Sequence, residues 1–157
     1  MQIKLIAIGK TDQIELDRLI SIYQNRLSHY VRFSFEIIPD LKNSKNLSEK
    51  LQKEAEGKLI LSKILPTDRL ILLDENGKEM DSVGFSSFLQ KQMNSGLKRL
   101  VLVIGGPYGF SQDVYQKATG KLALSKLTFS HQMVRLFVIE QLYRGFTILK
   151  NEPYHHR

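Results

Sequence analysis

The chain has 157 residues, of which 42% are hydrophobic and 25% are charged, and this composition favours one globular domain spanning residues 1–157. It contains no cysteine, which excludes disulfides, thiolate metal sites and a cysteine nucleophile. The net charge of +7 favours a polyanionic partner such as RNA or DNA, with an ordinary basic protein as the alternative.

The N-terminal segment predicts a strand at residues 2–8, where the pattern alternates and then becomes apolar before Gly9. Residues 1–13 become polar too quickly for a signal peptide, and no apolar run is long enough to cross a bilayer. The lack of cysteine fits a reducing compartment. We therefore expect a cytoplasmic protein.

Strands and helices are predicted to alternate along the rest of the chain. Further strands are predicted at 33–38, 69–73, 100–104 and 122–124, and helices opening near 10–12, 47, 81, 111 and 131. Asn46 and Glu49 have the spacing of a capping box, the polar loop 40–46 is expected to be mobile, and Asn76-Gly77 is a strong turn signal. This alternation predicts an α/β fold with a largely parallel sheet flanked by helices.

The stretch LVLVIGGPYGF at 100–110 is the most informative part of the sequence. It predicts a buried strand followed at once by Gly105 and Gly106, which places a turn without side chains at the carboxyl end of the strand. Ligands bind at that edge of open α/β sheets, and missing Cβ atoms let a ligand lie against the backbone. The pattern is neither GxGxxG nor a P-loop. It predicts a site for a nucleotide-like cofactor; the alternative is a common Gly-Gly-Pro turn after a strand that binds no ligand.

The predicted last helix, residues 131–150, is apolar around most of its circumference. One helix on the outside of a small sheet buries only one stripe against its own domain, so we expect a second subunit to cover the rest in a two-fold homodimer. Glu140 and Arg144 have i, i+4 spacing. Either they form a solvated ion pair, or Arg144, with Arg135, points into the cofactor cleft or the RNA.

The C-terminal tail, EPYHHR at 152–157, concentrates functional side chains. The ring of Tyr154 suits stacking on a base, and His155 suits proton transfer near neutral pH. The adjacent His155 and His156 lack a third ligand, so no metal site is predicted. His131, at the start of the last helix, is more simply read as a locally bonded histidine than as a catalytic one.

Six segments, taken together and in order, closely resemble one family. They are IKLIAIGK at 3–10, LLDENGKEMDS at 72–82, LVLVIGGPYGF at 100–110, LSKLTFSHQMVR at 124–135, IEQLYRGFTI at 139–148 and the terminal EPYHHR. The resemblance is to the RlmH family of ribosomal RNA large-subunit methyltransferases, in the SPOUT superfamily, and covers essentially the whole chain. It implies an α/β knot, in which the segment after the glycine turn threads through a loop to form a deep C-terminal trefoil.

The resemblance also implies a function. The enzyme would be a homodimer that uses S-adenosylmethionine to methylate N3 of a pseudouridine in the helix 69 loop of 23S rRNA, acting on assembled ribosomes. Two other functions stay open. A non-catalytic RNA- or ribosome-binding module accounts for the charge but not for the glycine turn or the tail, and another SPOUT enzyme would act on tRNA.

Finally, the resemblance implies roles for individual residues. The cofactor-binding positions of the family match Leu73, Gly106, Ser125, Lys126, Leu127, Thr128, Phe129 and Ser130. The positions that act on the substrate match Arg144, Tyr154 and His155, with His155 as the first candidate base for the N3 proton and Tyr154 as the second. The family often has proline where this chain has Ser130, a difference that alters the stiffness of the loop but leaves its backbone in place.

Overall fold

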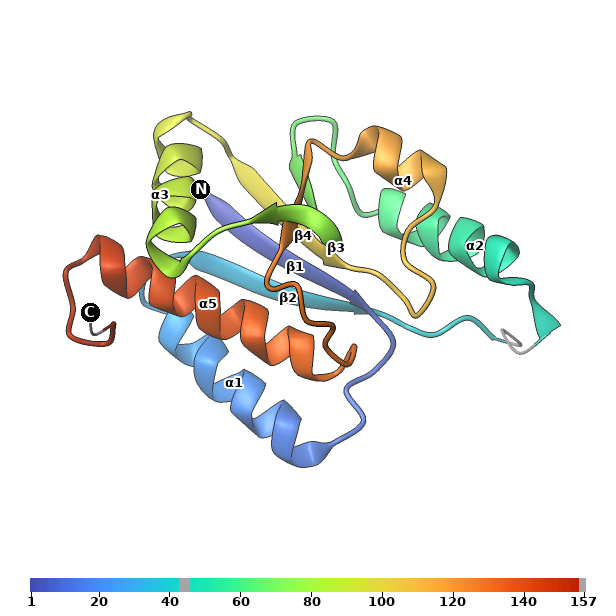
Figure 1. Ribbon diagram of the computed structural model, residues 1–157, viewed down its shortest axis with the longest axis horizontal. Helices are drawn as coiled ribbons and strands as arrows, with labels where there is room; N and C mark the ends of the chain where they lie inside the picture. The colour runs from blue at the N-terminus through green and yellow to red at the C-terminus, as the bar shows by residue number, and fades with distance from the viewer. Residues whose placement is uncertain (43–45, 156–157) are drawn as a thin grey trace.

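The alternation of strands and helices is confirmed by a computed structural model, which describes residues 1–42 and 46–155 (Figure 1). The strands are β1 (Gln2–Ile8), β2 (Arg32–Ile38), β3 (Arg69–Glu79), β4 (Arg99–Ile104) and β5 (Gly120–Ala123). The helices are α1 (Ile14–Ser28), α2 (Glu49–Leu61), α3 (Ser82–Asn94), α4 (Gln112–Lys117) and α5 (Met133–Leu149). No helix in the described ranges is long and apolar enough to span a membrane.

The strands form one sheet in the order β2-β1-β4-β3-β5, and each neighbouring pair is parallel. The carboxyl ends of the strands therefore meet at one edge. The apolar run 100–104 of β4 is fully buried at the centre of the sheet, as a strand with both faces covered requires. The glycine turn that follows β4 consequently lies in the middle of the carboxyl edge.

Each face of the sheet has its own hydrophobic core because side chains alternate along a strand. Leu102 points to the face covered by α1, α3 and α5, whereas Val101 and Val103 point to the face covered by α2 and α4. Figure 1 shows α5 lying in front of the sheet, between α3 and α1. The predicted parallel sheet flanked by helices is confirmed, and the trefoil knot stays a prediction.

Packing inside one chain explains most of the apolar surface of α5. Val138, Ile139 and Leu142 are buried in the core shared with α1 and α3. Met133 and Phe137 stay 40% and 37% exposed. The expectation that a second subunit covers the part of the helix not packed on its own domain therefore concerns a small exposed surface that includes Met133 and Phe137. The homodimer stays a prediction.

Two local predictions were wrong. The Asn76-Gly77 turn does not form, because β3 continues to Glu79 with a shift of register against β5. A Cβ on Gly77 would lie only 2.6 Å from the Leu122 nitrogen, so this glycine permits close approach of the strands. The cap of α2 is Ser48, not Asn46, since the hydroxyl of Ser48 accepts a hydrogen bond from the backbone N–H of Leu51. Part of the loop predicted to be mobile, residues 43–45, lies outside the described residues.

Candidate active site

A cavity of about 490 Å³ opens at the carboxyl edge of the sheet. Four segments form its walls: residues 73–76 in the middle of β3, the glycine turn at 105–109, the end of β5 with the residues after it at 122–125, and the loop 127–131 that leads into α5. Parallel pairing brings the first three together, because β3 lies between β4 and β5. The predicted ligand site thus coincides with a real hollow.

Most residues assigned to the cofactor by resemblance lie around this cavity. The lining includes Leu73, Gly106, Ser125, Leu127, Thr128 and Phe129. Lys126 and Ser130 do not line it. The side chain of Lys126 is 88% exposed, with its ammonium 4.0 Å from Glu79. The hydroxyl of Ser130 accepts a hydrogen bond from the N–H of Met133, so Ser130 supports the first turn of α5.

The glycines of the turn make space for different neighbours. Gly109 has φ +78°, and no atom lies within 4 Å of where its Cβ would be. A Cβ on Gly105 would meet the ring of Phe110 at 3.2 Å. At Gly106 it would lie 2.9 Å from the Cδ of Glu56, on α2. The expectation that the missing Cβ of Gly106 makes room for a ligand therefore needs correction, because the carboxyl of Glu56 occupies that space.

Two carboxylates give one wall of the cavity negative charge. Asp74 and Glu75 both line it. The hydroxyl of Tyr115, from α4, donates to Asp74 Oδ2 at 2.6 Å, and the N–H of Asn76 donates to Oδ1 at 2.8 Å. Burial of Tyr115 and its bond to Asp74 raise the pKa of Tyr115 to about 12. Negative charge, apolar walls and exposed backbone suit a cationic nucleoside such as S-adenosylmethionine.

Arg135 fixes the start of α5 beside the cavity. Its guanidinium is buried and donates to the carbonyl of Ile8 at 2.7 Å, to the hydroxyl of Thr11 at 3.0 Å and to the carbonyl of His131 at 2.9 Å. Burial lowers the pKa of Arg135. The alternative that Arg135 points into the cleft or the RNA is wrong. The residue instead ties α5 to the end of β1.

The predicted catalytic residues Arg144 and Tyr154 meet at the other end of α5. Glu140 Oε1 accepts from Arg144 Nε at 3.0 Å and from the hydroxyl of Tyr154, also at 3.0 Å. The guanidinium of Arg144 lies 4.8 Å from the centre of the Tyr154 ring. The Glu140–Arg144 pair is therefore formed and partly buried rather than fully solvated. Sequence reasoning paired these two residues but did not place Tyr154 on them.

Tyr154 and His155 differ in their polar contacts. The hydroxyl of Tyr154 lies 3.2 Å from that of Tyr23, and burial, this bond and Glu140 all raise the pKa of Tyr154. His155 Nε2 is buried, and no hydrogen-bond partner for it exists among the described residues. His156 and Arg157, the last two residues of the tail, lie outside those residues. His131, which sequence reasoning treated as local, is exposed and lines the cavity.

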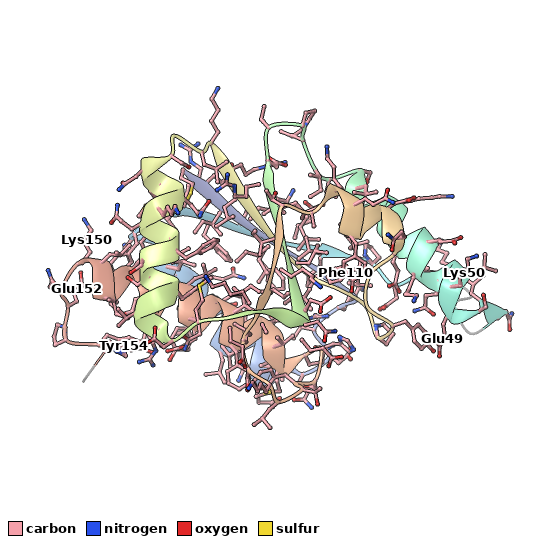
Figure 2. The ribbon with its side chains drawn as sticks, turned by 45° about the horizontal axis from the view of Figure 1, so that its top comes forward. Glu49, Lys50, Phe110, Lys150, Glu152 and Tyr154 are labelled. Atoms are coloured by element: carbon pink, nitrogen blue, oxygen red, sulfur yellow. The ribbon has the colours of Figure 1, made fainter. Side chains whose placement is uncertain are left out.

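The cavity and the chain end are separated within one chain. Val134 lines the cavity, and Arg144 lies ten residues further along α5, about 15 Å at the helical rise per residue. Figure 2 shows Tyr154 at the left of the molecule and Phe110, which lines the cavity, to the right of its centre. Among the described residues, Arg144 and Tyr154 therefore do not line the cavity of their own chain.

The fold and the cavity define the class of protein. The chain matches the family model described as "Predicted SPOUT methyltransferase" over residues 1–155, so it belongs to the SPOUT methyltransferase family. Enzymes of this class take their methyl group from S-adenosylmethionine. A probable methylase family protein from Haemophilus influenzae Rd KW20 has a similar fold, with a TM-score of 0.53 and 10% identity over 95% of this chain and 66% of that longer chain.

Close relatives define the family within that class. Proteins named Ribosomal RNA large subunit methyltransferase H are 72% identical to this chain in Flavobacterium psychrophilum, 71% in Flavobacterium johnsoniae and 66% in Christiangramia forsetii. Each match runs over 157 residues and covers 100% of both chains. The chain belongs to the family of these RlmH methyltransferases, and the resemblance noted in its sequence is confirmed.

Proposed function

We propose that this chain is a cytoplasmic methyltransferase, folded as one domain, that uses S-adenosylmethionine to methylate large-subunit ribosomal RNA. The observation that carries the proposal is full-length identity of 72% to a ribosomal RNA large subunit methyltransferase, in a chain with a cavity at the carboxyl edge of its sheet. The finer target follows from the family resemblance: N3 of a pseudouridine in the helix 69 loop of 23S rRNA, on assembled ribosomes. The net charge of +7 suits such a polyanion.

The cavity is the proposed methyl-donor site. Bound there, S-adenosylmethionine supplies an electrophilic methyl group on a positively charged sulfur. Leu73, Leu127 and Phe129 offer apolar walls, while the backbone of the glycine turn and of loop 125–130 offers hydrogen bonds to an adenine edge. The carboxylates of Asp74 and Glu75 offset the positive charge. Together these side chains and backbone groups align the methyl with N3, and no metal is required for methyl transfer.

The chain end is the proposed substrate site. N3 of pseudouridine is a weakly acidic imide that must lose its proton before it attacks the methyl, so a nearby base helps. His155 is the better candidate, since its buried Nε2 lacks a partner in the described part of the chain. The hydroxyl of Tyr154 already donates to Glu140, and the raised pKa of Tyr154 makes it a poor base. Arg144 suits holding a phosphate or a carbonyl oxygen of the base.

A homodimer supplies the missing contact between the two sites. Because Arg144 lies about 15 Å along α5 from the cavity-lining Val134, we infer that the chain end closes the cavity of a partner copy across a two-fold axis. Exposed apolar side chains near the cavity support such an interface. Leu127 is 74%, Phe129 38%, Met133 40% and Phe137 37% exposed, and the rings of Phe129 and Phe137 lie 5.1 Å apart.

Mixing two defective variants tests the composite site. One variant lacks residues 154–157, and the other carries Gly106→Leu, whose side chain overlaps Glu56 and displaces the glycine turn that lines the donor cavity; each alone should be inactive on ribosomes. Co-folded in equal amounts, they should regain about a quarter of the wild-type activity, because half of the dimers are mixed and each has one complete site. No recovery, with both variants folded and dimeric, would contradict a site shared between subunits.

Two further measurements test the substrate and the donor. With radiolabelled S-adenosylmethionine, wild-type protein should label the large-subunit RNA of assembled ribosomes. Label appearing mainly in tRNA would overturn the substrate, and the other SPOUT activity would be favoured. Absence of calorimetric heat on titration with S-adenosylmethionine would instead favour the non-catalytic RNA-binding module.

A further inference from the structure

A buried carboxyl group lies behind the glycine turn. Glu56, on α2, is only 3% exposed and is not among the residues that line the cavity. Its Oε1 accepts a hydrogen bond from Gln52 Nε2 at 2.9 Å. Its Oε2 has no hydrogen-bond partner in the described part of the chain and occupies the space where Gly106 would carry a Cβ. The cavity is thus on one side of the turn and Glu56 on the other.

The contact of the glycine turn with Glu56 is part of a larger contact surface on α2. Gly57, the next residue, lies against Ser111 and Val114, since its Cβ would be 3.1 Å from Ser111 Cβ and 3.2 Å from Val114 Cγ2. The segment from the turn to the start of α4 therefore rests on two consecutive residues of α2. Gly57 allows the helix to come close, and Glu56 places the polar atom that touches the turn.

The surroundings of Glu56 favour its neutral form. Burial is the largest effect and raises its pKa, the hydrogen bond from Gln52 opposes this in part, and the negative charge of Asp40 adds a smaller rise. No ion pair reaches Glu56 among the described residues. A carboxylate buried without a cation is destabilised relative to the neutral acid, so these surroundings favour a proton on Glu56.

The other titratable groups near this contact do not supply a counter-charge. The turn contributes Tyr108, which is 44% exposed. On α4, Tyr115 donates its hydroxyl to Asp74, while Asp113 and Lys117 are exposed. Asp40, on the segment after β2, is the charged group whose field acts on Glu56, and its sign is repulsive.

We propose that Glu56 is a positioning residue of the methyl-donor site, which as a neutral carboxylic acid supports Gly106 from behind and fixes the glycine turn. This inference rests on the proposed function, because it takes the cavity to be the donor site. When Glu56 ionises at higher pH, its charge must gain water, and the carboxyl has to move away from the turn. The turn then loses its support, and the affinity for the donor falls.

Calorimetric titration of the full chain with S-adenosylmethionine, from pH 6.5 to 9.5, tests the inference. Glu56→Gln keeps the shape and neutrality of the acid, so its affinity should match wild type at low pH and stay high where wild type has weakened about tenfold. Glu56→Ala should bind about tenfold more weakly throughout. Glu54→Gln, a charge removed from the exposed side of the same helix, should follow wild type at every pH.

Steady-state kinetics on ribosomes should give a matching split, with the KM for S-adenosylmethionine raised in Glu56→Ala and kcat nearly unchanged. Wild type and Glu56→Gln weakening together with pH would overturn the role of a neutral Glu56, and so would an unchanged affinity in Glu56→Ala. If Glu56→Ala does not fold, the comparison of wild type with Glu56→Gln still decides. Wild type that binds no donor at all would overturn the proposed function instead.

Discussion

The two ends of α5 border sites formed by different kinds of chemical group. At its start, the cavity is formed mainly by backbone, by the glycine turn and by apolar side chains. At its end, side chains bond one another, with Arg144 and Tyr154 both on Glu140. The first site depends on the path of the chain, and the second depends on particular functional groups. Substitutions should therefore act by steric displacement at the cavity and by loss of a group at the chain end.

The comparison also shows how the work is divided. Arg135 ties the start of α5 to β1, so the cavity belongs to the rigid centre of the fold. The chain end is anchored to the surface of the helix pair α1 and α5 through Tyr23 and through the bond of Tyr30 to Glu152. Donor binding and substrate chemistry should consequently be separable by mutation, and four predictions test that separation.

Removing residues 154–157 should have the largest effect. Turnover on ribosomes should fall about 100-fold or more, the range expected for loss of an acid–base group, because His155 and Tyr154 are both gone. Binding of S-adenosylmethionine, measured by calorimetry, should stay close to that of wild type. Full turnover in the truncated protein would remove the chain end from the mechanism, and lost donor binding would show that the two regions are not separable.

Gly106→Ala should weaken donor binding by about 1–3 kcal/mol, because the new methyl group overlaps the carboxyl of Glu56 and displaces the turn. Adding Glu56→Ala should recover part of this loss, a coupling that a double-mutant cycle measures. Gly120→Ala is the control, since its Cβ would meet Ile71 at an ordinary 3.4 Å. Independent, additive effects of the two substitutions would contradict the contact.

Glu140→Gln should lower turnover about tenfold while donor binding stays unchanged, because the amide holds Arg144 and Tyr154 less firmly than the carboxylate does. Without that negative charge, the pKa of Tyr154 should move down toward its ordinary value, which absorbance titration of wild type and variant can follow. Glu15→Gln, on the exposed side of α1, serves as the control. Equal loss in both variants would point to a general charge effect.

Tyr115→Phe should have the smallest effect, lowering stability by less than about 1 kcal/mol because the bond to Asp74 is partly open to solvent. The pKa of Tyr115 is raised to about 12, so the contribution of its hydroxyl is complete below pH 10 and is lost as the pH rises through 12. Thermal unfolding of both proteins should therefore differ at pH 9 and converge near pH 12. A stability difference between wild type and Tyr115→Phe that grows with pH would contradict a stabilising hydrogen bond from the protonated hydroxyl of Tyr115 to Asp74.

Much of the fold was predictable because burial leaves a local pattern. The apolar run of β4 and the glycines after it predicted a buried strand followed by a turn without side chains at its carboxyl end. Local signals failed where a distant segment decides the conformation. Asn76-Gly77 has the sequence of a turn, yet Gly77 lies in β3 because β5 passes against it.

The candidate site divides in the same way. Leu73 and Thr128 were assigned by resemblance, and both line the cavity. Lys126 is assigned on the same grounds but points to solvent. Arg135 and Glu56 are buried, although charged residues on helices are usually exposed and nothing in their spacing along the sequence predicts burial.

The sequence by itself determined the order of the elements, the parallel sheet, the place of the glycine turn and membership of the family, since these depend on the chemistry of neighbouring residues. The tertiary structure alone decided that Glu56 fills the space beside Gly106, that Arg135 holds β1, and that α5 separates the cavity from the chain end. The reason is physical: periodicity records which side of an element is buried, but the partner across the interface depends on how distant segments pack.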